Sequence, residues 1–190
     1  MKTLFFNVMI IILFLFSCIK NPTELEIKKQ YLMPLEKGNT WNYKSVHGDM
    51  TSYFKFEVLN EITINGKKYV ILDSNTVARN DNNGLLLAGY NYEGQGKIYD
   101  DIFFKYPIKF GETFSYTPLD KDEEPYKFKV SSGSIHVQAG QFNCYVYKFI
   151  DNNGKEVFPF FYFTPGIGLI KIEFEADEKE KIELISYKLE

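Results

Sequence analysis

Apolar and polar residues alternate with a period of two along much of this chain, the spacing of a half-buried β-strand. Turn pairs of the Asn-Gly type separate these runs and favour tight hairpins, because they tolerate positive φ angles. The alternating runs include "YFKFEV" (53–58) and "YKFKV" (126–130), and the turn pairs are Asn65-Gly66, Asn83-Gly84 and Asn153-Gly154. The pattern predicts an all-β protein of about nine to twelve strands in a curved, twisted antiparallel sheet, half-barrel or sandwich-like.

A ten-residue frame occurs twice, as "PLEKGNTWNY" at 34–43 and as "PIKFGETFSY" at 107–116. An alternating strand and then a glycine with a nearby aromatic residue follow each frame in the same order. This order predicts two diverged repeats, at about 31–90 and 104–175. Since buried aromatic residues mostly belong to the core, we interpret the frame as scaffold. The alternative is an aromatic ligand clamp formed by Trp41 and Phe114.

The first residues have the layout of a secretion signal, with Lys2 ahead of an apolar run and a small residue before Cys18. The run is shorter than the roughly 20 apolar residues that cross a bilayer. Its last four residues, "LFSC", resemble the lipobox of bacterial lipoproteins, and they predict a signal peptide at 1–17 and lipidation of Cys18. The alternative is an ordinary signal peptide with an incidental cysteine. Residues 18–30 are polar and read as a tether, followed by a single β domain at 31–190.

Acyl chains on Cys18, palmitate among them, would hold the protein on a membrane, because stable anchoring needs two or more chains. Ile19 follows the cysteine where aspartate would retain a lipoprotein in the inner membrane of enteric bacteria. The expected location is therefore the cell envelope and, by that rule, the outer membrane. Periplasmic and surface orientations both stay open.

Charge and cysteine content narrow the classes of partner. The 190 residues have a formal net charge of -3, and Arg79 is the one arginine. No cluster of basic residues exists to follow a phosphate backbone, so nucleic acid is not an expected partner. With Cys18 acylated only Cys144 would remain as a thiol, so no intrachain disulfide is expected.

The residue types that carry catalysis are scarce. The two histidines, His47 and His136, and Cys144 in an alternating strand are too few for a closed zinc site. No G-x-S-x-G elbow accompanies them. The sequence therefore predicts no catalytic residues, no metal and no cofactor. The acidic stretch "LDKDEEP" (119–125) could hold calcium, but it lacks the spacing of a calcium loop and is interpreted as a solvated loop.

The stretch "FPFFYFTPG" (158–166) has aromatic residues at both parities of a strand, so both of its faces are apolar. Either the protein covers both faces, or one face lines a groove for a lipid or another protein. For the groove, the expected apolar ligand face consists of Trp41, Phe114, Phe160 and Tyr162.

Three segments, "PLEKGNTWNY", "AGQFNCYVYKF" and "FTPGIGLIKIEF", resemble the signposts of a widespread family of uncharacterised bacterial envelope lipoproteins. The resemblance spans most of the chain after the signal. It implies a curved antiparallel sheet akin to the half-barrels of periplasmic lipoprotein carriers, and it brings no catalytic residues.

From these features we expect a non-enzymatic, lipid-anchored envelope protein that acts as a binding or structural module. Its partner could be another envelope protein. The first alternative is a periplasmic carrier of apolar ligands or lipids. The second is a carboxylate-based hydrolase, for which the sequence offers no supporting spacing.

Overall fold

The computed structural model describes residues 30–190 except 92–96, 120–124 and 175–179. The described residues contain thirteen strands and no helix, which confirms the all-β prediction. The strands are Thr40–His47 (β1), Met50–Glu57 (β2), Glu61–Ile64 (β3), Lys67–Ile71 (β4), Thr76–Asn80 (β5), Gly84–Asn91 (β6), Lys97–Lys105 (β7), Thr113–Tyr116 (β8), Tyr126–Val137 (β9), Gly140–Ile150 (β10), Glu156–Thr164 (β11), Gly168–Glu173 (β12) and Glu180–Lys188 (β13). Across these residues, no helical segment has the length and apolar character of a membrane span.

The predicted number of strands was too low, because residues 61–105 alone divide into five strands, three of which have only four or five residues. The tightest of the turns that divide them is Asn65-Gly66, where both residues have positive φ angles of 49° and 75°. Such a two-residue turn joins β3 and β4 as a hairpin.

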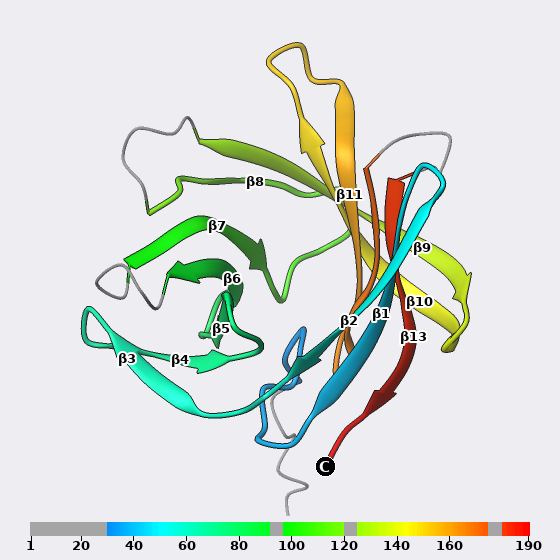
Figure 1. Ribbon diagram of the computed structural model, residues 1–190. Coiled ribbons are helices and arrows are strands. Elements are labelled where there is room, and N and C mark those ends of the chain that lie inside the picture. Colours follow the sequence, from blue (N-terminus) through cyan, green and yellow to red (C-terminus); the bar gives the residue numbers. More distant parts are fainter. Residues whose placement is uncertain (1–29, 92–96, 120–124, 175–179) are drawn as a thin grey trace, which may run out of the picture.

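All pairings are antiparallel, and they form two sheets. The large sheet has the order β2-β1-β13-β12-β11-β10-β9-β8, and the small sheet has the order β3-β4-β5-β6-β7. Figure 1 shows the small sheet standing beside the curved large sheet. The chain passes from one sheet to the other between β2 and β3, where Glu57 N–H donates to Leu72 O at 2.9 Å and Leu59 N–H donates to Ile71 O at 3.1 Å. The predicted half-barrel or sandwich-like architecture is confirmed.

Aromatic rings fill the space between the two sheets. Phe104 of β7 is fully buried. Its ring centroid lies 4.6 Å from Phe163, 5.1 Å from Phe161 and 5.2 Å from Tyr147, all of which belong to the large sheet. Ring pairs at these distances stabilise the fold by more than the burial of their apolar area alone. The core that joins the sheets is therefore built largely from rings.

The two sequence frames have the same local structure. Gly38 N–H donates to Val58 O at 3.1 Å, and Gly111 N–H donates to Val130 O at 2.7 Å. Each valine N–H donates back to the residue that follows the glycine, at 2.9 and 3.0 Å. Both glycines have positive φ angles, 93° and 87°. Each frame is therefore a glycine turn clamped to the strand that pairs with the frame.

The pairing that follows each frame also matches. Trp41 of β1 lies opposite Phe56 of β2, and Phe114 of β8 lies opposite Phe128 of β9. The copies diverge afterwards, since β3 and β4 enter the small sheet whereas β9 and β10 stay in the large one. The two frames therefore share their hydrogen bonding and strand pairing, but the segments that follow them occupy different places in the fold.

Candidate functional site

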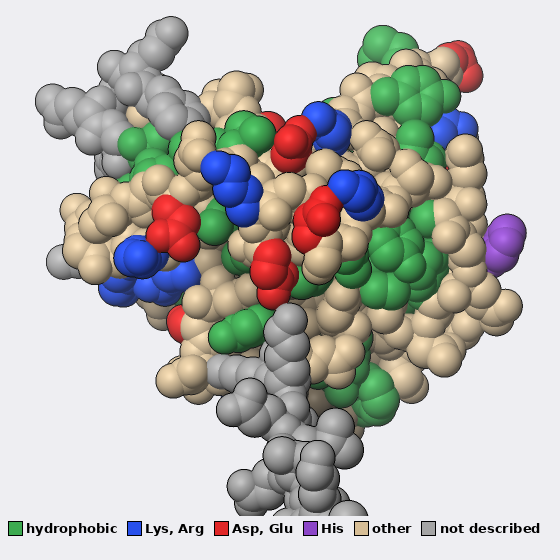
Figure 2. Space-filling view, turned by 90° about the horizontal axis from the view of Figure 1, so that it is seen from below, with side chains coloured by type: hydrophobic (Ala, Val, Ile, Leu, Met, Phe, Trp, Pro, Cys, Tyr) green, Lys and Arg blue, Asp and Glu red, His purple; other side chains and the backbone are tan. Residues whose placement is uncertain are grey.

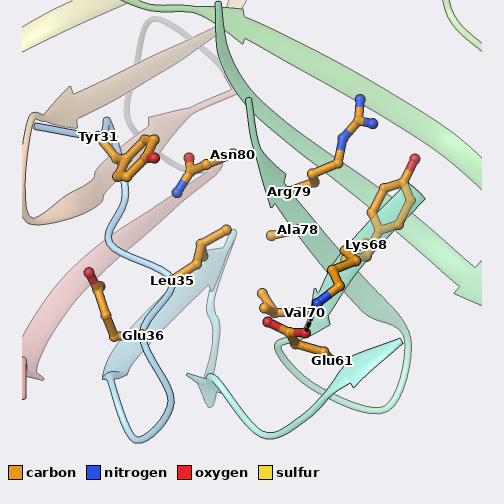
Figure 3. Close-up of a pocket in the computed structure, with 10 residues that line it drawn as sticks. Tyr31, Leu35, Glu36, Glu61, Lys68, Val70, Ala78, Arg79 and Asn80 are labelled. Carbon is orange, nitrogen blue, oxygen red and sulfur yellow. Dashed lines mark hydrogen bonds and ion pairs between the residues drawn. The ribbon is translucent and has the colours of Figure 1, made fainter. Parts of the chain in front are cut away.

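A hollow of about 250 Å³ lies between the segment that precedes β1 and the strands β4 and β5 (Figure 3). β4 and β5 pair only through Val70–Ala78 and Ile71–Val77, so the strands separate beyond these pairs. The hollow is lined by Tyr31, Leu35, Glu36, Glu61, Lys68, Tyr69, Val70, Ala78, Arg79 and Asn80. Sequence analysis did not find this site, because its position depends on where two paired strands part.

The segment 31–36 is held firmly against the sheets. Leu32 and Met33 are buried, and Asn80 Nδ2 donates to Met33 O at 2.8 Å. Gly166 N–H donates to Tyr31 O at 2.8 Å. One wall of the hollow is therefore an irregular segment fixed by bonds to both sheets.

The side chains that point toward the segment combine an apolar floor with hydrogen-bond acceptors. Ala78 and Val70 alternate with Tyr69 and Arg79, so they lie on the inner face of the small sheet together with Asn80. The Asn80 Oδ1 atom is buried and has no hydrogen-bond partner among the described residues. A buried acceptor without a donor is costly, so a ligand O–H or N–H group that displaced the wall of the hollow enough to reach this oxygen would gain a hydrogen bond that the protein itself does not supply.

Charged groups stand at the rim. Glu36 Oε2 accepts a hydrogen bond from Asn39 Nδ2 at 3.2 Å. Lys68 Nζ lies 3.1 Å from Glu61 Oε2, and both side chains are exposed. A surface pair of this kind contributes about 0.2–1 kcal/mol. The rim therefore holds charges of both signs, with one more carboxylate than ammonium group.

Arg79 and Tyr69 contribute from the opposite face of the small sheet. The Arg79 guanidinium carbon lies 5.2 Å from the centroid of the Tyr69 ring, and Figure 3 shows the guanidinium directed away from Leu35 and Asn80. Burial raises the pKa of the Tyr69 hydroxyl above its ordinary value, against the opposing effect of the Arg79 charge. Tyr69 and Arg79 therefore border the hollow, but the Arg79 guanidinium points away from its interior.

The molecular face seen in Figure 2 carries interspersed basic and acidic side chains. A surface with both signs mixed produces no extended field of one sign, and such a field is what steers charged polymers to a protein.

The four residues of the expected apolar ligand face do not come together. Trp41 is fully buried and donates from Nε1 to Ile167 O at 2.6 Å. Phe114 stacks on Phe128 in the core, with centroids 5.1 Å apart. Phe160 and Tyr162 alternate along β11 with two rings that contact Phe104, so they point to the other face of the large sheet. One apolar surface containing all four residues was therefore a wrong expectation.

The second face of β11 is covered partly by lysine side chains. Lys148 Nζ lies 5.1 Å from the centroid of the Phe160 ring. Lys171 Nζ lies 6.0 Å from that of Tyr162, whose hydroxyl donates to Glu173 Oε2 at 2.5 Å. Lys171 is buried and forms ion pairs with Glu173 at 2.5 Å and Glu183 at 3.8 Å. Lysine stems over aromatic rings explain how the protein tolerates a strand with two apolar faces.

The residues considered for catalysis do not lie together in one site. His47 Nδ1 lies 2.8 Å from Glu180 Oε1 at the surface, and His136 is exposed on another strand. Cys144 is buried, and burial raises the pKa of its thiol. A raised pKa opposes formation of the reactive thiolate. Among the described residues, no group of three or more His, Cys, Asp or Glu side chains is arranged to hold a metal ion.

Two predicted features lie outside the described residues. They are the lipidation site with its tether, Cys18 and most of 18–30, and the acidic stretch at 120–124. Both stay predictions.

No protein-family model matches this chain, and no curated protein matches its sequence. Two crystal structures are similar. One is a candidate exported protein with a YmcC-like fold from Bacteroides fragilis NCTC 9343, with 15% identity and a TM-score of 0.48 over 84% of this chain and 100% of that chain. The other is a candidate lipoprotein from Parabacteroides distasonis ATCC 8503, with 13% identity and a TM-score of 0.42 over 84% and 99%. At these values the likeness carries no inference about function.

Proposed function

We propose that this protein is a non-enzymatic, lipid-anchored binding module of the bacterial cell envelope, with its ligand site in the hollow between residues 31–36 and the parting strands β4 and β5. The observation that carries the ligand site is the buried Asn80 Oδ1 atom without a donor, beside an apolar floor. A ligand with hydroxyl or N–H groups would satisfy this oxygen, whereas a lipid chain would leave it unpaired.

The size and rim of the hollow favour a small polar ligand. About 250 Å³ is slightly below the usual range of roughly 300–1,000 Å³ for ligand pockets. The Glu36 and Glu61 carboxylates add acceptors at the rim, and Tyr31 offers a partly exposed ring. Acceptors, a ring and an apolar floor together suit one sugar unit of an envelope glycan, which presents hydroxyl groups on its edge and C–H groups on its face.

The proposed anchor and the proposed site lie close together in the chain. Tyr31 lines the hollow and directly follows Gln30, the end of the predicted tether. If Cys18 carries the acyl chains, about twelve residues separate the membrane from the site, a reach of roughly 40 Å at full extension. The site would therefore sample glycan near the membrane that holds the protein. Mass spectrometry of the mature N-terminus checks the anchor, and a free α-amine at a residue other than Cys18 would exclude it.

The two alternatives gain no comparable support. For an apolar carrier, the rings around Phe104 fill the space between the sheets. For a carboxylate-based hydrolase, the most buried carboxylate among the described residues, Asp101, already accepts hydrogen bonds from the Tyr116 hydroxyl and from Leu119 N–H. Glu173 is engaged by a lysine, with Lys171 Nζ 2.5 Å away. A paired carboxylate keeps its charge and is a poor proton donor.

The ligand site is tested by titrating isotope-labelled protein with the disaccharide of N-acetylglucosamine and recording amide chemical shifts. We expect shifts centred on Tyr31, Leu35, Lys68 and Asn80, with a Kd near 1 mM, about -4 kcal/mol. Asn80→Leu removes the free oxygen and should abolish binding. Asn80→Asp keeps an acceptor there and should retain binding, although both variants lose the bond to Met33 O. Equal loss in both variants, or shifts elsewhere, would contradict the assignment.

A further inference from the structure

Among the described residues, β2 forms a free edge of the large sheet and pairs only with β1 over most of its length. Glu57 N–H is already used by Leu72 O, so residues 50–56 form the open part of the edge. Seven residues span about 23 Å. Met50 and Tyr53 are both 68% exposed, so no described part of the chain covers them.

The other sheet edges in the described part of the chain are blunted, as sheet edges usually are. β3 and β8 have four residues each, and β8 lies between Pro107 and Pro118. β7 is distorted by Asp100, with a φ angle of 47°, and by an irregular register opposite Leu87 and Gly89. β2 has no proline, no irregularity in its pairing with β1 and one charged side chain within 50–56.

The backbone groups that face the open edge can be identified. Glu57 N–H points away from β1 to Leu72 O, and Val58 N–H points the opposite way to Asn39 O. Since backbone groups alternate sides along an antiparallel strand, Thr51, Tyr53 and Lys55 direct their N–H and C=O groups to the open edge. These three residues offer a regular set of hydrogen-bonding groups.

We propose that the β2 edge is a homodimer interface, in which β2 of a second copy of this chain pairs antiparallel with it about a two-fold axis at Tyr53. In this register Tyr53 faces its own copy, and Thr51 faces Lys55 on either side of the axis. All three facing pairs are of the hydrogen-bonded kind, and each exchanges two backbone bonds. The two large sheets join into one.

A second copy fits this edge for three reasons. The axis at Tyr53 lies at the centre of the open residues 50–56, so both copies use the whole edge. The partner strand turns away at its own Gly48–Asp49 turn, just before the place that Leu72 fills. Residues 50–56 of the two copies form seven cross-strand pairs in this register, and none of them places like charges opposite each other. An axis at Lys55 would instead place two lysines opposite each other.

The apolar side chains of the edge also benefit. Phe54 and Phe56 are half-buried and pack on Tyr43, with ring centroids 5.1 and 5.5 Å away. The proposed register places the partner's Met50 beside Phe56 and the partner's Ser52 beside Phe54. A second copy would therefore cover rings that this protein leaves open at its rim.

Disulfide trapping in the native envelope tests the axis directly. Facing residues of a hydrogen-bonded pair have Cα atoms about 5.5 Å apart, within disulfide range. Tyr53→Cys should give a covalent dimer on mild oxidation. Ser186→Cys, exposed on β13, which β1 separates from the edge strand, should not. The wild type, with Cys144 buried, controls for its own cysteines.

A charge-exchange experiment distinguishes this specific dimer from random collisions between copies held on the same membrane. Tyr53→Lys and Tyr53→Glu each place like charges on the axis, and each should lower dimer affinity at least about tenfold in sedimentation of the full chain in detergent. Mixing the two variants should restore a dimer, and Ser186→Lys should have no effect. Three results would overturn the proposal: a wild type that stays monomeric at about 100 µM, equal trapping in the Tyr53→Cys and Ser186→Cys variants, or no restoration on mixing.

Discussion

Trp41 shows how one residue of the repeated frame ties distant parts of the chain together. Its ring is fully buried, and its Nε1 donates to Ile167 O at 2.6 Å in the turn between β11 and β12. The neighbouring Gly168 has a φ angle of 117°, and a Cβ atom there would lie 2.9 Å from Met33 Cγ and 3.3 Å from Trp41 Nε1. Trp41 therefore joins the first frame to a turn 126 residues later. The close approach of Met33 and Trp41 to position 168 requires glycine there.

We expect Trp41→Ala to lower the free energy of unfolding by about 3–5 kcal/mol, because it deletes a large buried ring. Trp41→Phe keeps most of the ring but leaves the Ile167 carbonyl without its donor, which should cost about 1–3 kcal/mol. Urea unfolding followed by tyrosine fluorescence or circular dichroism measures both. A Trp41→Ala variant with an unchanged unfolding midpoint would show that the ring is not structural.

At the scale of elements, the glycine turn of each frame depends on backbone conformation as well as on space. Gly111 has a φ angle of 87°, and nothing lies within 4 Å of a Cβ atom built on it. Gly38 has a similar angle, but a Cβ atom there would lie 3.3 Å from Glu190 Cγ. Gly111 therefore isolates the conformational requirement.

Gly111→Val should lower stability by about 1–3 kcal/mol, because a β-branched residue strongly disfavours positive φ. Gly111→Asn should cost clearly less, since asparagine tolerates that region. Chemical unfolding of the two variants side by side gives the difference. Equal losses would mean that volume or another contact, rather than the φ angle, sets the requirement for glycine.

The elements also show what the sequence could and could not predict. Alternation identified β2 and β9, and the repeated frame identified the turns before β1 and β8, because these features depend on local spacing. "GLLLAGY" in β6 has apolar residues on both faces, since Leu85 packs in the main core and Leu86 in a second cluster on the outer face of the small sheet. Such a run lacks the alternation of apolar and polar residues from which a strand is predicted.

The candidate site was beyond sequence analysis for a related reason. Its hollow exists because β4 and β5 share two residue pairs and then part, and because residues 31–36 lie against the gap. Neither fact has a local signal in the chain. The same holds for Tyr162, whose parity predicts an outward ring, while the covering Lys171 comes from the next strand.

At the scale of the whole molecule, the ring-rich core includes phenol groups that the fold keeps protonated. Burial raises the pKa of Tyr43, whose hydroxyl donates to Leu169 O at 3.0 Å. Burial likewise raises the pKa of Tyr147, whose hydroxyl donates to Lys105 O at 2.8 Å. The pKa values of Tyr106 and Cys144 are raised in the same direction. The ordinary values that apply in the unfolded chain are 10.0 for tyrosine and 9.0 for cysteine.

These shifts make the protein sensitive to alkali. Above pH 9 to 10 the unfolded chain loses protons that the folded protein retains, so stability is complete below this range and falls as the pH rises through it. Each tyrosine held fully protonated should contribute about 1.4 kcal/mol of loss per pH unit once the unfolded form is ionised. Urea unfolding at pH 7, 9, 10 and 11 should show this fall.

Tyr147→Phe should be about 1 kcal/mol less stable at pH 7, because its hydrogen bond is lost, yet it should lose stability with pH less steeply than the wild type. Tyr187→Phe, at an exposed position of β13, is the matched control and should follow the wild-type slope. Parallel slopes for the wild type and Tyr147→Phe would mean that the buried phenol of Tyr147 is not what limits the protein at high pH.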